Sequence, residues 1–212
     1  MHIIEGMMKM TKKKIIYIVL SLVILICIAT IVFIKLFVLA PPKVTITKIE
    51  ICQEAAMGRE TKEERLKFLK GMYDESKNAY SDDMGEFWQG DPPTYENIED
   101  YLYIAYTIKV DNPTFVKSSS YSPAFYVEDI DLSENFFITN DLQISGFYID
   151  RRSEAEVSFC FWAYKKGFSK ERIEEFVHSV VLKLNYYNRF QKNQSVKIDS
   201  KDADIEFIDV DF

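Results

Sequence analysis

A run of twenty residues without a charged side chain, residues 15–34, constrains this chain more than any other feature. An α-helix rises about 1.5 Å per residue and the hydrocarbon core of a bilayer is about 30 Å thick, so the run has the length of a membrane span. The core helix of a soluble protein rarely combines such a run with an adjacent group of lysines. The sequence therefore predicts a transmembrane anchor over residues 15–38.

The lysines around this segment predict its orientation. The tail formed by residues 1–14 is basic, whereas lysines are more widely spaced after the segment, starting with Lys35; the tail lysines are Lys9, Lys12, Lys13 and Lys14. Basic residues close to a span are retained in the cytoplasm. We therefore expect a cell-membrane protein with a cytoplasmic N-terminus and an extracytoplasmic remainder.

A cleaved signal peptide is the alternative explanation of the apolar run. The apolar region of a signal peptide is usually about 7–15 residues long and ends at a small-x-small cleavage site. The best site here is Val38-Leu39-Ala40, but Pro41 follows it directly and would obstruct cleavage. A retained anchor is the preferred interpretation.

After a spacer, residues 39–43, the sequence predicts one mainly-β domain over residues 44–212. Hydrophobic residues alternate with polar ones in several segments, as in half-buried strands. Residues 157–164 are apolar on both faces, which favours a central strand. The strand candidates are 44–52, 101–110, 124–127, 136–139, 142–149, 157–164, 180–187 and 205–212. Their spacing predicts an antiparallel β-sandwich that resembles immunoglobulin-like domains in architecture.

Two short helices are expected to interrupt the strands. Thr61 and Glu64 have the spacing of a capping box, in which each side chain binds a free backbone N–H at the start of a helix. Ser169 is expected to cap the second helix. Its apolar stripe, which we expect to pack on the sheet, consists of Ile173, Phe176, Val177 and Val180.

The segment with most room for function lies within an insertion at about residues 60–100. From residue 74 to residue 100 it mixes aromatic and acidic side chains, and the candidate binding surface consists of Asp82, Asp83, Glu86, Phe87, Trp88 and Tyr95. Such side chains suit a protein-recognition surface, or a site that stacks on sugar rings. Alternatively, Phe87 and Trp88 close one end of the sandwich while the acidic groups face water.

Catalytic and metal-binding patterns are missing from the sequence. Beyond the span there are one histidine, His178, and two cysteines, Cys52 and Cys160. These residues cannot form a zinc site, and they suggest no catalytic triad. We expect no enzyme activity, no metal and no cofactor, although composition alone does not exclude a hydrolase with two carboxylates. A disulfide between the two cysteines is chemically allowed outside the cytoplasm, if the sheet order brings them together.

These observations predict a membrane-anchored binding or assembly module that contacts another protein at the cell envelope. Recognition of envelope glycan is the alternative, and an extracytoplasmic hydrolase ranks third. Residues 36–212 carry 21 basic and 32 acidic side chains. This excess of negative charge disfavours nucleic acid, because the phosphates would be repelled.

Overall fold

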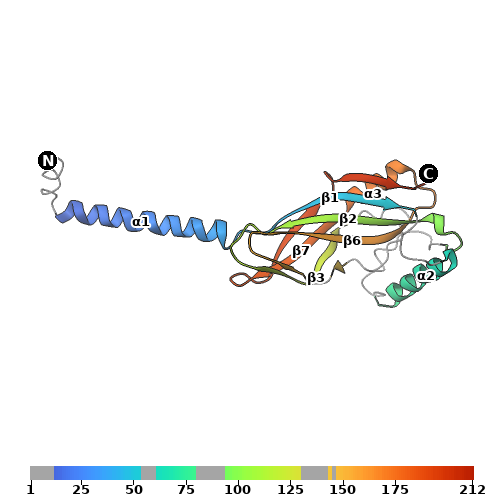
Figure 1. Cartoon of the computed structure of the whole chain (residues 1–212), viewed down its shortest axis with the longest axis horizontal. Helices are drawn as coiled ribbons and strands as arrows, with labels where there is room; N and C mark the ends of the chain where they lie inside the picture. Colours follow the sequence, from blue (N-terminus) through green and yellow to red (C-terminus); the bar gives the residue numbers. More distant parts are fainter. Residues whose placement is uncertain (1–11, 54–60, 80–93, 130–142, 145–146) are drawn as a thin grey trace. The chain divides into compact units, whose positions relative to one another are not determined.

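The computed structural model describes residues 12–53, 61–79, 94–129, 143–144 and 147–212 (Figure 1). The chain divides into two compact units, Met1–Ala40 and Pro41–Phe212. The first unit contains one described helix, and the second is a mostly-β domain with two sheets and few helices.

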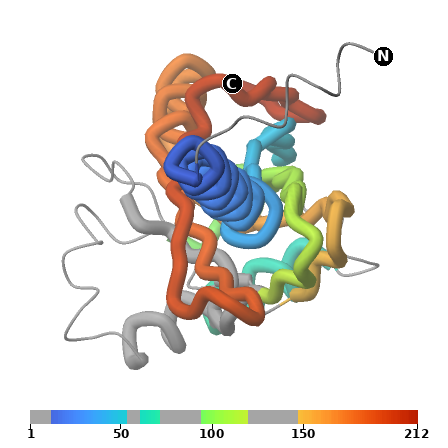
Figure 2. Tube along the Cα trace, turned by 90° about the vertical axis from the view of Figure 1, so that its left-hand side faces the viewer, coloured from blue at the N-terminus to red at the C-terminus, as the bar shows by residue number. Residues whose placement is uncertain are grey.

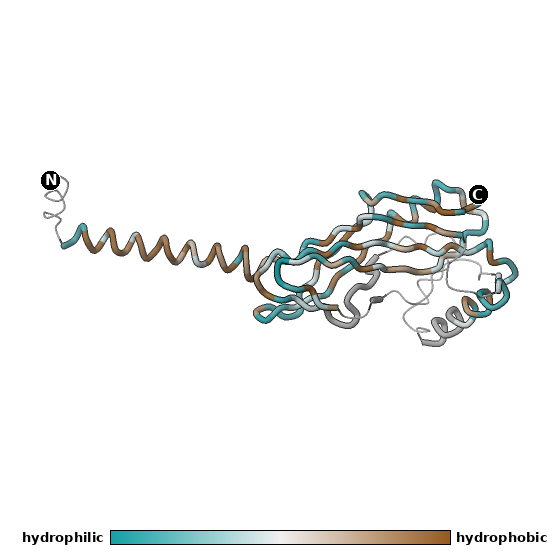
Figure 3. The backbone as a smooth tube through the Cα atoms, in the orientation of Figure 1, coloured by the Kyte–Doolittle hydropathy of each residue, from teal (hydrophilic) through white to brown (hydrophobic). Residues whose placement is uncertain are grey.

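The helix of the first unit, α1, extends over Lys12–Phe37. It is long and apolar enough to cross a membrane, and Figure 3 shows hydrophobic residues along most of its length. Its one described side-chain hydrogen bond is internal, because Thr30 Oγ1 donates to the carbonyl of Ile26 at 2.8 Å. This bond satisfies the Thr30 hydroxyl within the helix itself.

Two sheets form the β domain. The first, sheet A, has the order β6-β2-β1-β9, with bounds β1 Lys43–Cys52, β2 Tyr101–Asp111, β6 Glu154–Tyr164 and β9 Asp204–Ile208. The second, sheet B, has the order β4-β3-β7-β8, and β5 also pairs with β3. Its bounds are β3 Ser118–Asp129, β4 Gln143–Ile144, β5 Tyr148–Ile149, β7 Val181–Asn188 and β8 Gln194–Asp199.

The main core lies on the inner faces of these strands. Alternate residues of β1, β2, β6 and β7 are buried there, among them Ile49, Ile104, Tyr106, Phe161 and Leu184. Buried and exposed side chains alternate along these strands, as apolar and polar residues alternate in the sequence. The strand predictions over 44–52, 101–110 and 180–187 are confirmed. The candidate over 136–139 lies outside the described residues.

Two features of the sheets differ from the prediction. The strand over 157–164, expected to be central, is β6 at the edge of sheet A. A helix covers the outer face of this strand. Its outer apolar side chains are therefore buried even though β6 has a neighbouring strand on one side only. The sheets are also not wholly antiparallel, because β9 pairs parallel with β1. The chain leaves β8 in sheet B, turns over residues 200–203 and enters sheet A.

Helix α3, Lys170–Ser179, completes the main core. Ser169 Oγ accepts a hydrogen bond from the N–H of Arg172, so the predicted cap is confirmed. The apolar stripe of the helix is buried between the sheets, where the ring of Phe176 meets that of Phe161 edge-on. The hydroxyls of Tyr106 and Ser200 both donate to the carbonyl of Val177. These bonds satisfy a backbone group near the end of the helix.

Candidate functional site

The outer face of sheet A is polar at one end and aromatic at the other. Near the end of β2 and the start of β6 it is polar, and Lys109 Nζ lies 2.7 Å from Glu154 Oε2. At the opposite end, two cross-strand pairs consist entirely of aromatic residues: Tyr101 with Tyr164, and Tyr103 with Trp162. The outward face of an antiparallel sheet is commonly solvated and polar. The aromatic end therefore needs a covering element or a partner.

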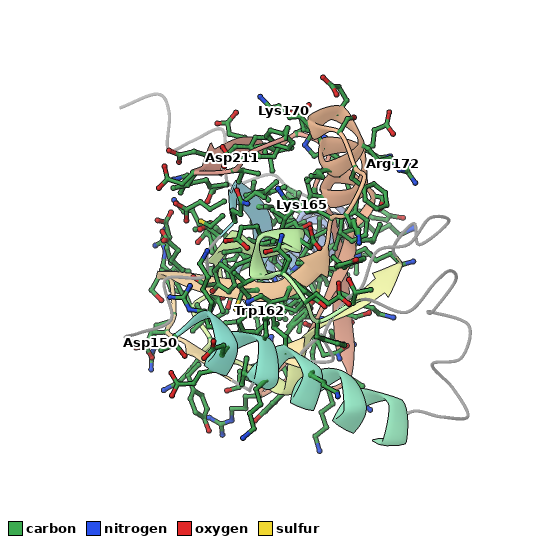
Figure 4. The ribbon with its side chains drawn as sticks, turned by 90° about the vertical axis from the view of Figure 1, so that its right-hand side faces the viewer. Asp150, Trp162, Lys165, Lys170, Arg172 and Asp211 are labelled. Carbon is green, nitrogen blue, oxygen red and sulfur yellow. The ribbon has the colours of Figure 1, made fainter. Side chains whose placement is uncertain are left out.

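Helix α2, Lys62–Ala79, supplies part of that cover. Leu69 is buried against Trp162 and Tyr101, together with Ile98 of the short 3-10 helix η2, Ile98–Asp100. The adjacent Phe68 meets the edge of Trp162 at 5.6 Å between ring centroids but stays 44% exposed. Figure 4 shows Trp162 beside α2. The helix thus covers the aromatic residues but leaves one large ring open to solvent.

The position of α2 is fixed at its first turn. The N–H of Thr61 donates to Glu64 Oε2 at 2.8 Å, and the N–H of Glu64 donates to Thr61 Oγ1 at 3.3 Å. The predicted capping box is therefore confirmed. Lys62 forms an ion pair with Glu99 of η2. This pair connects the start of the helix to the segment that leads into β2.

We use the name aromatic platform for Phe68, Tyr95, Tyr101, Tyr103, Trp162 and Tyr164. Tyr95 stacks on Tyr101 with ring centroids 5.8 Å apart, and the rings of Tyr101 and Tyr164 are 5.2 Å apart. Thr94 forms hydrogen bonds with two of these tyrosines. Its carbonyl accepts a hydrogen bond from the hydroxyl of Tyr101, and its hydroxyl lies 3.0 Å from the hydroxyl of Tyr164.

Burial raises the pKa of both Tyr101 and Tyr103 above the usual range of tyrosine. A tyrosine hydroxyl is already neutral at physiological pH, and burial keeps these two neutral to still higher pH. Such groups combine a large apolar surface with a polar tip, as at protein interfaces.

Among the residues of the predicted binding surface, the structure describes only Tyr95. It is half-buried and packs on Tyr101 within the platform. Asp82, Asp83, Glu86, Phe87 and Trp88 lie outside the described residues. Sequence reasoning missed the other five residues of the platform, although the apolar outer side of residues 157–164 was a usable signal for Trp162 and Tyr164. The five are Phe68, Tyr101, Tyr103, Trp162 and Tyr164.

Cys52 and Cys160 are free thiols on the outer face of sheet A, on either side of Tyr103. Strand β2 lies between their strands, β1 and β6. Two strand spacings are about 10 Å, whereas a disulfide requires Cα atoms within about 7 Å. The disulfide that the sequence allows is therefore not formed in this structure.

Hydrogen bonds and a neighbouring lysine stabilise the charged form of some described carboxyl groups. Three of them have displaced pKa values, and all three are lowered: hydrogen bonds from Thr61 lower that of Glu64, Lys62 lowers that of Glu99, and a backbone hydrogen bond lowers that of Glu171. His178 is half-buried, with Nε2 3.4 Å from the carbonyl of Ala203. Within the described ranges, no three metal-ligating side chains converge.

The chain was compared with protein-family models and with curated proteins. No family model matches it, and no curated protein is significantly similar.

Proposed function

We propose that this chain is a single-pass membrane protein that displays an immunoglobulin-like domain and binds a protein partner at the cell envelope. Support for anchoring comes from α1, and support for a cytoplasmic N-terminus comes from the lysines at positions 9, 12, 13 and 14. The acidic remainder would then be extracytoplasmic.

The order of the strands supports the immunoglobulin-like assignment. Such domains place strands A, B and E in one sheet and C, F and G in the other. With β1, β2 and β6 as A, B and E, and with β3, β7 and β8 as C, F and G, the neighbours agree with the observed sheets. Helix α3 then lies in the E–F connection, and β9 is an added strand beside A.

The single observation that carries the binding function is the exposed ring of Phe68 at the edge of the aromatic platform. Energetic hot spots of interfaces are rich in tryptophan and tyrosine, surrounded by residues that exclude water. Trp162, Tyr101 and Tyr164 are buried beneath helix α2, and Phe68, which packs against Trp162, is the ring of the platform that a partner can reach. No comparable support exists for glycan recognition, whose expected residue Trp88 lies outside the described ranges.

Photocrosslinking in the native membrane tests this proposal. Benzoylphenylalanine in place of Phe68 should capture one defined protein, identified by mass spectrometry. The same group in place of Phe115, a ring of matched exposure at 42% against 44%, is the control and should not capture that protein. With the purified partner, Phe68→Ala should weaken binding about tenfold, as expected for an interface hot spot. Equal capture at both positions, or no capture at position 68, would overturn the proposal.

A further inference from the structure

Three turns meet at the end of the β domain where β1 begins. Lys43 of β1 pairs with Asp111, the last residue of β2, while Ser118 at the start of β3 pairs with both Ile149 and Asn188. The β2–β3 loop is bound to the β5–β6 turn, because the N–H of Arg152 donates to the carbonyl of Thr114. Figure 2 looks onto this end of the domain.

Large exposed aromatic residues concentrate at this end. Outside α1, the described residues include five exposed large hydrophobic side chains, and three of them lie here: Phe115, Tyr148 and Phe190. Phe115 lies in the β2–β3 loop, Tyr148 in strand β5 and Phe190 in the β7–β8 turn. Their exposed fractions are 42%, 70% and 61%.

A cation accompanies each of these rings. Lys117 Nζ lies 4.9 Å from the ring centre of Tyr148, Arg152 Cζ lies 4.8 Å from that of Phe115, and Arg189 Cζ lies 6.0 Å from that of Phe190. Arg152 also has a φ of 50°, a left-handed conformation that disfavours a long side chain. An arginine at a position suited to glycine or asparagine points to a use for its side chain.

Basic side chains also concentrate at this end of the domain. Six basic side chains, all exposed, surround this end: Lys43, Lys117, Arg151, Arg152, Arg189 and Lys192. The acidic ones there are Asp111, Asp150 and Glu154, which is the register partner of Asp111. Residues 36–212 are acidic as a whole, so a local excess of positive charge is a departure from their composition. We call this surface, with its three aromatic rings, the basic rim.

We infer that the basic rim binds the anionic phospholipid headgroups of the membrane that α1 crosses. The inference rests on the proposed anchoring. Five residues, 38–42, separate the end of α1 from the start of β1, and an extended chain spans at most about 3.5 Å per residue. Phe37 and Lys43 are six residue steps apart, so the start of β1 is tethered within about 21 Å of the end of the helix. Aromatic rings favour the interfacial layer, and arginine pairs with phosphate.

The test uses the full chain in lipid nanodiscs containing equal parts of phosphatidylglycerol and phosphatidylcholine. Benzoylphenylalanine replaces Phe190 in one sample and Phe212 in the other. Both rings are 61% exposed, but Phe212 follows β9, whose end pairs with the opposite end of β1. We expect lipid adducts at position 190, with phosphatidylglycerol favoured about threefold or more, and none at position 212.

Charge variants test the recognition of the headgroup. Arg151→Gln with Arg189→Gln should abolish the preference for phosphatidylglycerol at position 190. Lys166→Gln with Lys201→Gln, two exposed cations outside the rim, should leave it unchanged. All four side chains are exposed, so none of these changes removes core packing.

The outcomes separate this inference from the proposed anchoring. Protein that enters the nanodiscs without adducts at position 190, or with adducts lacking a headgroup preference, would overturn the inference alone. Protein that does not enter the nanodiscs would overturn the anchoring and the inference together.

Discussion

Asn112 is the residue on which the β2–β3 loop depends. It is 1% exposed, its amide nitrogen donates to the carbonyls of Val116 and Asp150 at 2.8 and 3.1 Å, and its oxygen accepts from the N–H and hydroxyl of Thr114. One side chain therefore satisfies buried groups from two connections. A buried group that loses its partner costs about 1–3 kcal/mol.

We expect Asn112→Ala to lower the free energy of unfolding by about 2–3 kcal/mol, because it leaves several of these groups without a partner. The measurement is urea unfolding of the full chain in detergent. Asn97→Ala is the control: Asn97 is exposed and makes no side-chain cap hydrogen bond to η2, so its change should stay within about 0.5 kcal/mol. Equal effects at the two positions would show that the network of Asn112 contributes little.

The sequence predicts the turn at Asn112 but not this network. Asn112-Pro113 marks the end of β2, because proline cannot continue a paired strand and asparagine favours turns. The acceptors of the side chain, however, include residues near position 150, which the pairing of β2 with β6 and of β3 with β5 brings close. The local sequence thus predicts the turn, whereas the pairing of distant strands determines which groups its side chains bind.

At the scale of elements, helix α2 depends on Leu69. This side chain is 2% exposed and is the most deeply buried described residue of the helix. Leucine-to-alanine changes in a core cost about 2–5 kcal/mol. Since α2 packs on the outer face of sheet A and not in the main core, most of this cost should appear as local opening of the helix.

We expect Leu69→Ala to accelerate hydrogen exchange in the first half of α2 by about 30-fold, which corresponds to about 2 kcal/mol. Amides of β2 and β7 should change little, because their inner faces pack in the main core. Lys67→Ala, at an exposed position of the same helix, is the matched control. Unchanged exchange in α2 would mean that other contacts hold the helix.

The elements were predictable where their signals are local. Capping residues at Thr61 and Ser169 identify both helix starts, since each interaction closes within three residues. Strand β8 was missed because only Val196 and Ile198 of its six residues are apolar and face inward. The edge position of β6 and the aromatic platform were missed for another reason: they depend on which strand lies beside which, and alternation does not encode that order.

At the scale of the whole molecule, the platform and the basic rim lie at opposite ends of β2. The strand runs from Tyr101 in the platform to Asp111 at the rim, about 33 Å at 3.3 Å per residue. If the rim rests on headgroups, the platform stands clear of the lipid, where a partner can reach it. The two proposals are therefore compatible, and each end of the domain would have its own ligand.

Both proposals require that α1 remains in the membrane, and a charge placed within it tests this. Arginine at the centre of a span opposes insertion by about 2.5–3.5 kcal/mol. We expect Leu25→Arg with Ile26→Arg to release the chain from membranes during alkaline carbonate extraction, while Leu25→Ile with Ile26→Leu stays in the pellet. Protease added to intact cells should digest the β domain of the parent chain. Protection of that domain until the cells are lysed would contradict the proposed orientation, and extraction of the parent chain would contradict the anchor itself.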